Sequence, residues 1–237
     1  MKRFLMLALV AGCFQLNAQS SPDLIKHYEA YYNQMKTQGD MQGVINAMTH
    51  LNVLSPSVAR QDTLAYIYMS EGKYVQALNT IGIERNVGDS DIAVEVKALS
   101  LKSVKRPALA IGHFEELFKR NPNALIAYEL AELNLQIQKL DEALKHINYG
   151  LANAKEDMTK AFYETQKPYQ VSLKAAFMYL NALVVYNQDT KANIDKAVDI
   201  LDATQKTAPN FNLIQLTKSE LLRQKQALTQ AAAQPKN

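Results

Sequence analysis

The sequence predicts an all-α fold, a solenoid of tandem helix-turn-helix repeats that ends in irregular C-terminal helices. Pairs of a small residue followed by an aliphatic residue recur every 33 residues, starting at positions 44, 77, 110 and 143. Prolines at 56, 122 and 209 each lie 12 residues after the small residue at 44, 110 or 197, where they cannot extend a helix. With 8 glycines and 7 prolines in 237 residues, the chain has too few breakers for a many-turned sheet.

The N-terminal residues have the pattern of an export signal. Lys2 and Arg3 precede an apolar run over residues 4–14, which is too short to span a bilayer stably. Cleavage after Ala18 would remove residues 1–18 as a signal peptide. This interpretation predicts a periplasmic or secreted protein.

A lipoprotein signal over residues 1–12 is the alternative. Val10-Ala11-Gly12-Cys13 resembles a bacterial lipobox, and Cys13 is the single cysteine of the chain. Lipidation of Cys13 would anchor the protein to the outer membrane. In either case the mature chain has no disulfide.

The charge and hydropathy patterns exclude two other classes of partner. The 26 basic and 23 acidic residues give a net charge of only +3, and no run of five or more basic residues occurs. We therefore expect no nucleic-acid partner. No later apolar run reaches the roughly 18 residues of a membrane-spanning helix, so we expect no transmembrane helix.

Residues 22–152 are predicted to form four helical hairpins. Gly39 and Gly72 lie where the first helix of a hairpin turns into the second, and Gly72 suits the left-handed conformation that ends a helix. One hairpin cannot bury its apolar face alone, so the four are expected to stack into a continuous core. Large apolar residues follow the small ones by four positions, on the same helix face: Met48, Ile81, Phe114 and Ile147.

These units resemble tetratricopeptide repeats (TPRs). The best-matching unit reads Leu64-Ala65-Tyr66-Ile67-Tyr68, then Gly72-Lys73-Tyr74, then Ala77-Leu78 and Ile81. The resemblance covers about residues 25–211 and implies a right-handed superhelical solenoid. It also implies that the first helix of each hairpin lines the concave face, where partners of this family commonly bind.

The repeat register breaks after Leu151. We expect the insertion, residues 153–170, to contain a short helix that ends before Pro168. The C-terminal part is then divided into a fifth, looser hairpin over 171–211, a capping helix over 212–230 and a disordered tail over 231–237.

No residue pattern points to catalysis. His113 and His146 are 33 residues apart, at equivalent places on neighbouring second helices, but a metal site would need more donors. The chain has no Gly-rich phosphate loop, no HExxH and no Gly-x-Ser-x-Gly. We expect no enzyme activity, no metal and no cofactor.

The repeat register predicts which side chains line the concave face. The face has an apolar centre that would suit an amphipathic helix or an extended apolar peptide. The alternative is that the C-terminal helices fold across the groove and fill it. The predicted partner-binding residues are Asn33, Tyr66, Met69, Ile92, Val96, Leu99, Tyr128 and Glu132.

The predicted function is a non-catalytic scaffold or adaptor of the bacterial cell envelope that binds a protein or peptide partner. One alternative is an obligate subunit of an envelope secretion or assembly machine, which would use its outer surface and residues 153–170. A second alternative is a small-ligand receptor or enzyme with its site in the irregular C-terminal part. Fold alone does not decide among these.

Overall fold

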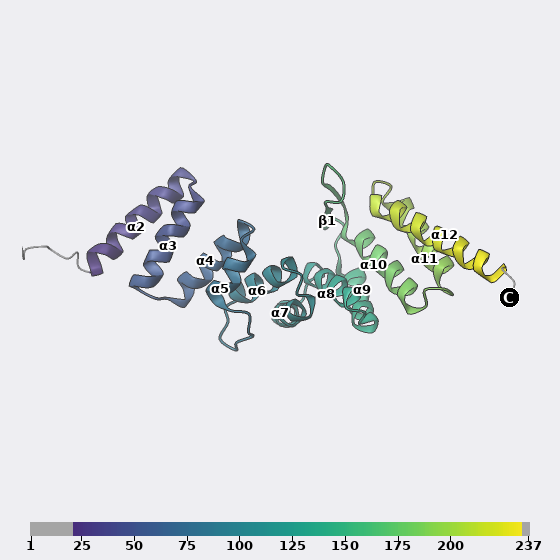
Figure 1. Ribbon diagram of the computed structural model, residues 1–237, viewed down its shortest axis with the longest axis horizontal. Helices are drawn as coiled ribbons and strands as arrows, with labels where there is room; N and C mark the ends of the chain where they lie inside the picture. The colour runs from purple at the N-terminus through teal and green to yellow at the C-terminus, as the bar shows by residue number, and fades with distance from the viewer. Residues whose placement is uncertain (1–20, 234–237) are drawn as a thin grey trace, which may run out of the picture. The chain divides into compact units, whose positions relative to one another are not determined.

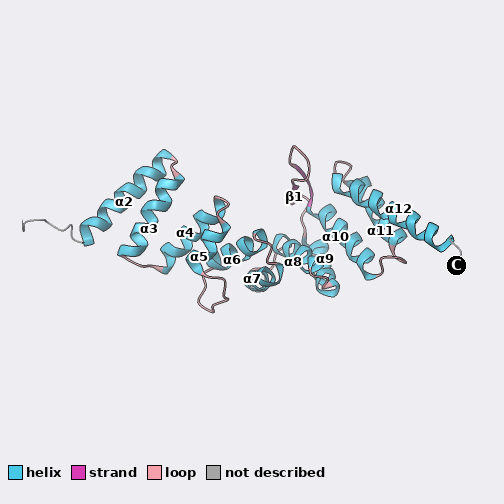
Figure 2. Ribbon diagram, in the orientation of Figure 1, coloured by secondary structure: helices cyan, strands magenta, loops and turns pink. Residues whose placement is uncertain are grey.

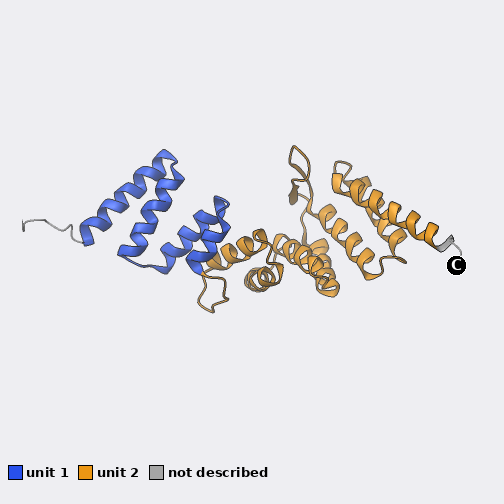
Figure 3. Cartoon of the chain, viewed as in Figure 1, with its two compact units in different colours: residues 1–81 blue, residues 82–237 orange. Residues whose placement is uncertain are grey.

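The computed structural model describes residues 21–233, which form helices and one two-stranded sheet (Figures 1 and 2). The predicted signal segment, with Cys13, and the last four residues of the predicted tail lie outside the described residues. No helix within 21–233 is long and apolar enough to cross a membrane. The chain divides into two compact units, residues 21–81 and residues 82–233 of the described chain (Figure 3).

Unit 1 consists of two helical hairpins: α2 (Ser21–Gln38) with α3 (Met41–Leu54), and α4 (Val58–Ser70) with α5 (Tyr74–Ile81). Asp40 begins α3 by accepting a hydrogen bond from the Gly43 amide, which satisfies one of the free donors at a helix start. The apolar core of the unit contains Met35, Val44, Ile45, Met48, Leu64 and Ile67.

Unit 2 continues the hairpin pattern and then departs from it. Its third hairpin is α6 (Asp91–Ser103) with α7 (Pro107–Arg120), and its fourth is α8 (Ala124–Gln136) with α9 (Leu140–Asn153). The chain then forms strands β1 (Thr159–Phe162) and β2 (Tyr169–Ser172), followed by α10 (Leu173–Gln188), α11 (Ile194–Thr207) and α12 (Asn212–Ala233).

The turn inside each of the first four hairpins has the same backbone conformation. Gly39 and Gly72 have φ of 71°, and Lys105 and Gln138, at the equivalent positions, have φ of 59°. Glycine adopts this left-handed conformation freely, whereas a residue with a Cβ does so at a cost. The repeat geometry therefore imposes the turn at Lys105 and Gln138, where the residue type does not favour it.

A buried lysine fixes the loop over residues 82–90. Gly82, with φ of 77°, follows the short α5. The Lys97 side chain is 0% exposed, and its Nζ lies 2.6 Å from Asp89 Oδ2 and 2.8 Å from the Glu84 carbonyl oxygen. A buried charge needs such partners. Leu64 and Leu130 stand at the equivalent positions of the second and fourth hairpins, so the third hairpin replaces a core leucine by an ion pair.

The prediction of a helix in the insertion was wrong, because this segment forms a β-hairpin. Strands β1 and β2 pair antiparallel, with Ala161 opposite Gln170 and Phe162 opposite Tyr169. Phe162 is buried and its ring centre lies 4.7 Å from that of Phe211. Burial of this aromatic side chain on the helical layer gives the hairpin a stability that two strands alone would lack. Pro168 lies in the connecting loop, where it removes no ladder hydrogen bond.

One continuous core of unit 2 runs from α8 to α12 and includes the contact of α8, α9 and α10. The Phe177 ring stands edge-on to Tyr128, with ring centres 5.4 Å apart. Gly150 on α9 permits this arrangement, because a Cβ there would lie 2.0 Å from Phe177 Cζ. The Phe177 side chain of α10 thus occupies the space that a larger residue at position 150 would fill.

Candidate functional site

A groove of about 480 Å³ lies between α6, α7 and α8 in unit 2. These helices are the third hairpin and the first helix of the fourth. An apolar surface with a few polar groups around it is typical of a ligand-binding site. The groove is lined by the apolar residues Leu99, Phe114, Leu117, Leu125 and Ile126 and by the polar residues Asp91, Glu95, Arg120, Asn121, Asn123 and Glu129.

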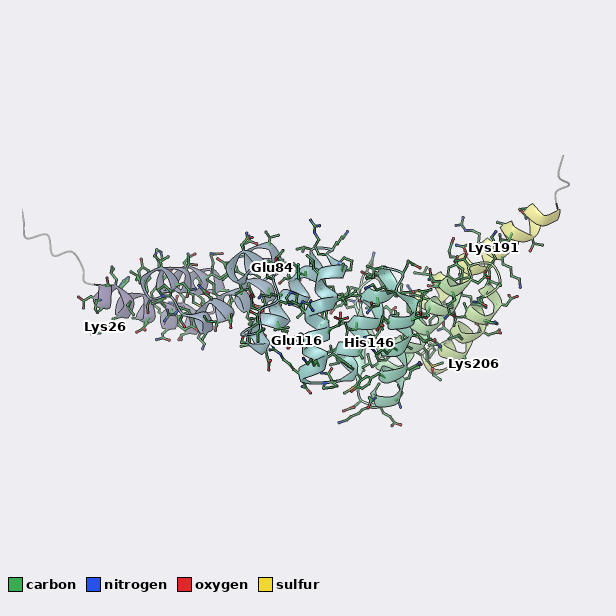
Figure 4. All side chains as sticks on the ribbon, turned by 90° about the horizontal axis from the view of Figure 1, so that it is seen from below. Lys26, Glu84, Glu116, His146, Lys191 and Lys206 are labelled. Carbon is green, nitrogen blue, oxygen red and sulfur yellow. The ribbon has the colours of Figure 1, made fainter. Side chains whose placement is uncertain are left out.

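Arg120 organises one end of the groove. Its Nη1 donates to Asp91 Oδ1 at 2.8 Å and to the Asp89 carbonyl oxygen at 3.0 Å, and its Nε donates to Glu116 Oε1 at 2.8 Å. Glu116 is labelled in Figure 4. Hydrogen bonding to Asp91 and Glu116 raises the pKa of Arg120. The Arg120 guanidinium and the Asp91 carboxylate therefore neutralise each other at the groove.

Glu95 is the uncommitted charge of the groove. It is exposed, lines the groove and forms no ion pair with any residue in the described chain. Its carboxylate is available to a cationic group of a ligand, and such a contact would orient the ligand more than it would strengthen binding.

Glu129 joins the groove to the β-hairpin. Its Oε1 lies 2.7 Å from Lys160 Nζ of β1, and its Oε2 accepts a hydrogen bond from Lys102 of α6. Burial acts to raise the pKa of Glu129, but the two lysines outweigh it, and the pKa is lowered. Lys102 also lies 2.5 Å from Glu132 Oε2. The network holds α6, α8 and β1 together.

The structure places the predicted partner-binding residues in different environments. Leu99 lines the groove, Ile92 is exposed on the same helix, and Glu132 is paired with Lys102. Asn33 and Met69 belong to unit 1, as does the exposed Tyr66.

Two of the predicted partner-binding residues are core residues, and these assignments were wrong. Val96 is 0% exposed and Tyr128 is 1% exposed. Val96 lies on the side of α6 that packs into the hairpin. Tyr128 is covered by Phe177 and by Lys160, whose Nζ lies 4.6 Å from the Tyr128 ring centre. Neither side chain is accessible to a partner.

Sequence reasoning missed Glu95, Leu117 and Lys160. Leu117 was missed because it lies on a second helix, and only first helices were considered as the lining of the concave face. Leu117 is 33 residues before Gly150, so the two residues hold equivalent repeat positions. Lys160 escaped because the insertion has no repeat register. The change from Leu117 to Gly150 is a signal that the two inter-hairpin spaces differ.

The two equivalent histidines are buried. His113 Nε2 lies 2.9 Å from the Ile83 carbonyl oxygen, whereas His146 stands edge-on to Phe118 with ring centres 5.3 Å apart. Burial lowers the pKa of both imidazoles, so both are neutral near pH 7. No group of three or more potential metal-ligating side chains occurs within residues 21–233.

No protein-family model matches the sequence, and no curated protein matches it. Solved structures do match in fold. A tetratricopeptide repeat protein from Parabacteroides merdae is 14% identical, with 88% of this chain and 77% of that chain covered and a TM-score of 0.61. YrrB, described as a TPR protein with an unusual peptide-binding site, is 14% identical, with coverage of 88% and 97% and a TM-score of 0.62.

A third match is MamA from Desulfovibrio magneticus, at 11% identity, with 80% of this chain and 98% of that chain covered and a TM-score of 0.59. Likeness at these identities concerns the fold. The chain is an all-α array of TPR-like helical hairpins with irregular C-terminal helices, as the repeat spacing predicts.

Proposed function

We propose that this protein is a non-catalytic scaffold that binds a peptide segment of a partner protein in the groove between α6 and α8. The observation that carries the proposal is the groove itself, with its apolar lining and the uncommitted Glu95 carboxylate. An apolar side chain of the partner would displace water from the groove, and a nearby lysine or arginine would face Glu95.

We further propose that the scaffold acts in the bacterial cell envelope. Lys2 and Arg3, the apolar run and Ala18 support export with removal of residues 1–18. Lipidation of Cys13 stays as the alternative. Fractionation of the native host, with a Cys13→Ser variant beside the wild type, tests both. Normal processing of Cys13→Ser into the soluble periplasm contradicts an anchor, and a wholly cytoplasmic protein contradicts export.

The binding test compares two exposed leucines. Leu125 is 50% exposed and lines the groove, whereas Leu109 is 47% exposed on α7 and lies outside it. A library of short random peptides displayed on phage is selected on the full chain, and the affinity of each selected peptide is measured by fluorescence anisotropy. Leu125→Asp should weaken binding by at least about tenfold, because it replaces an apolar side chain of the groove by a further carboxylate.

Leu109→Asp is the matched control and should bind as the wild type does. Leu99→Asp is a second groove variant, and its unfolding transition must be measured because Leu99 is half-buried. Equal affinities for wild type, Leu125→Asp and Leu109→Asp would contradict the groove as the site. Capture of partners from the native host with the same three proteins then shows which partners depend on the groove.

A further inference from the structure

The β-hairpin has one open backbone edge, that of β1, and one edge, that of β2, which is capped by a side chain. In an antiparallel pair, alternate residues exchange hydrogen bonds across the pair, and the residues between them direct their N–H and C=O groups outward. The Leu173 amide donates to the Met158 carbonyl oxygen at 2.8 Å. Counting from this pair along the register, Thr159 and Ala161 of β1 and Gln170 of β2 direct their backbone groups away from the hairpin.

The outer edge of β2 is capped at its Gln170 carbonyl by the chain that follows. Asn210, between α11 and α12, donates from Nδ2 to the Gln170 carbonyl oxygen at 3.0 Å. By contrast, no described residue forms a hydrogen bond with the outward N–H and C=O groups of Thr159 and Ala161. An edge with free donors and acceptors can pair with an added strand.

Strand β1, which carries the open edge, contacts a residue that lines the groove. Asn210 is bonded to the β2 edge, so the β1 edge is the one without a partner in the described chain. Lys160 of β1 contacts Glu129, and Glu129 itself lines the groove. The hairpin projects from the helical layer beside α10 (Figure 1). One extended chain could therefore pass from the groove, past Glu129, to β1.

The edge is held in place before any ligand arrives. Phe162 stacks on Tyr169, with ring centres 5.9 Å apart, and both rings contact Phe211. The side chain of Lys160, also on β1, is held by its ion pair with Glu129 and by its contact with the Tyr128 ring. A fixed edge loses little conformational entropy when a strand pairs with it.

We propose that the partner segment binds in an extended conformation and adds a third strand along β1, while its apolar residue occupies the groove. This inference rests on the proposed function and specifies the ligand as an extended peptide of a partner protein, with a basic residue for Glu95. Main-chain pairing would supply affinity that does not depend on sequence, and the groove would supply selectivity.

Two prolines test the edge, because Ala161 and Gln170 are partners in the register and both direct their N–H outward. Proline at either position removes an outward donor and no backbone hydrogen bond between the strands. Gln170→Pro also removes the exposed side-chain hydrogen bond that Thr159 Oγ1 donates to Gln170 Oε1 at 3.0 Å, so an effect of this cross-strand bond would show in the Gln170→Pro variant. Ala161→Pro should lower the affinity for the phage-selected peptide by about tenfold. Gln170→Pro should leave that affinity unchanged. Both variants should keep the wild-type circular dichroism spectrum and unfolding midpoint.

Hydrogen exchange gives an independent measurement on the full wild-type chain. The Ala161 amide should exchange fast in the free protein and become protected when the peptide is present. The inference is overturned if Ala161→Pro binds as the wild type does, if the amide stays unprotected, or if the bound peptide gains helical circular dichroism. Protection of Ala161 without peptide, together with a dimer in size-exclusion chromatography, would assign the edge to a second copy instead.

The two proposals can fail separately. Sensitivity to Leu125→Asp without sensitivity to Ala161→Pro keeps the groove and rejects the added strand. The absence of any peptide that distinguishes Leu125→Asp from the wild type rejects both.

Discussion

The third hairpin, α6–α7, and the fourth, α8–α9, have the same repeat spacing but leave different surfaces. Between α6 and α8 the groove over Leu117 is open. Between α8 and α10 the equivalent space is filled, because Gly150 replaces the leucine and Phe177 enters. Lys160 then covers Tyr128 from β1. A helical repeat thus provides a series of similar spaces, and the side chains from the next element decide which of them stays accessible.

The largest expected effect comes from emptying the filled space. Phe177→Ala should reduce the free energy of unfolding by about 3–5 kcal/mol, since Phe177 is fully buried and its loss leaves a cavity. Leu125→Ala, at the half-exposed groove position, should cost less than about 1 kcal/mol. Urea unfolding of both variants measures the contrast. Equal losses would mean that the groove and the filled space do not differ in packing.

Substitution of Lys97 should have the next largest effect on the free energy of unfolding. Lys97→Leu introduces the residue found at position 130 of the fourth hairpin, but it leaves Asp89 and the Glu84 carbonyl oxygen without their partner. We expect a loss of about 3 kcal/mol. The double variant Lys97→Leu with Asp89→Ala should recover most of this in the same urea experiment. A single variant as stable as the wild type would show that the ion pair does not hold the loop.

Lys160→Ala tests the cover over Tyr128 and should cost about 1 kcal/mol, the usual scale of a partly desolvated cation–π contact. It also removes one of the two cations that lower the pKa of Glu129. The lowered pKa gives stability that is present above the pKa of the unfolded chain and is lost as pH falls through the folded value. The variant should therefore show a smaller difference in stability between pH 7 and pH 3. An unchanged difference would contradict the role of Lys160.

The smallest effect concerns His113 and His146. Burial lowers the pKa of both, so the unfolded chain binds protons at a higher pH than the folded chain does. Their contribution is present above the ordinary imidazole pKa of about 6.5 and is lost as pH falls below it. His146→Leu should flatten the decline in stability between pH 7 and pH 5, as measured by urea unfolding. A decline as steep as that of the wild type would contradict the assignment of His146.

Much of the fold could be predicted because hairpins depend on local patterns. The small residues at 44, 77, 110 and 143 are all buried in second helices. The β-hairpin could not be predicted because two four-residue strands give too short an alternation to distinguish from other structures. The left-handed turns at Lys105 and Gln138 could not be predicted from residue type, since neither residue is a glycine.

The residues that the register assigned to the concave face do not share one environment. Leu99 lines the groove, whereas Val96 on α6 and Tyr128 on α8 are buried. On a helix, exposure to a groove or to the core changes within one residue step of about 100°. If the assumed orientation of a helix is wrong by one such step, a residue assigned to the groove is in fact a core residue.

The sequence by itself determined the array of TPR-like hairpins, because the 33-residue spacing fixes contacts within each hairpin and with the next. Only the tertiary structure decided which part of unit 2 is open. That outcome depends on contacts across the break in register, above all Phe177 at Gly150 and Lys160 at Glu129. Such contacts follow from where a folded insertion places its side chains in space, and no local pattern of residues specifies that.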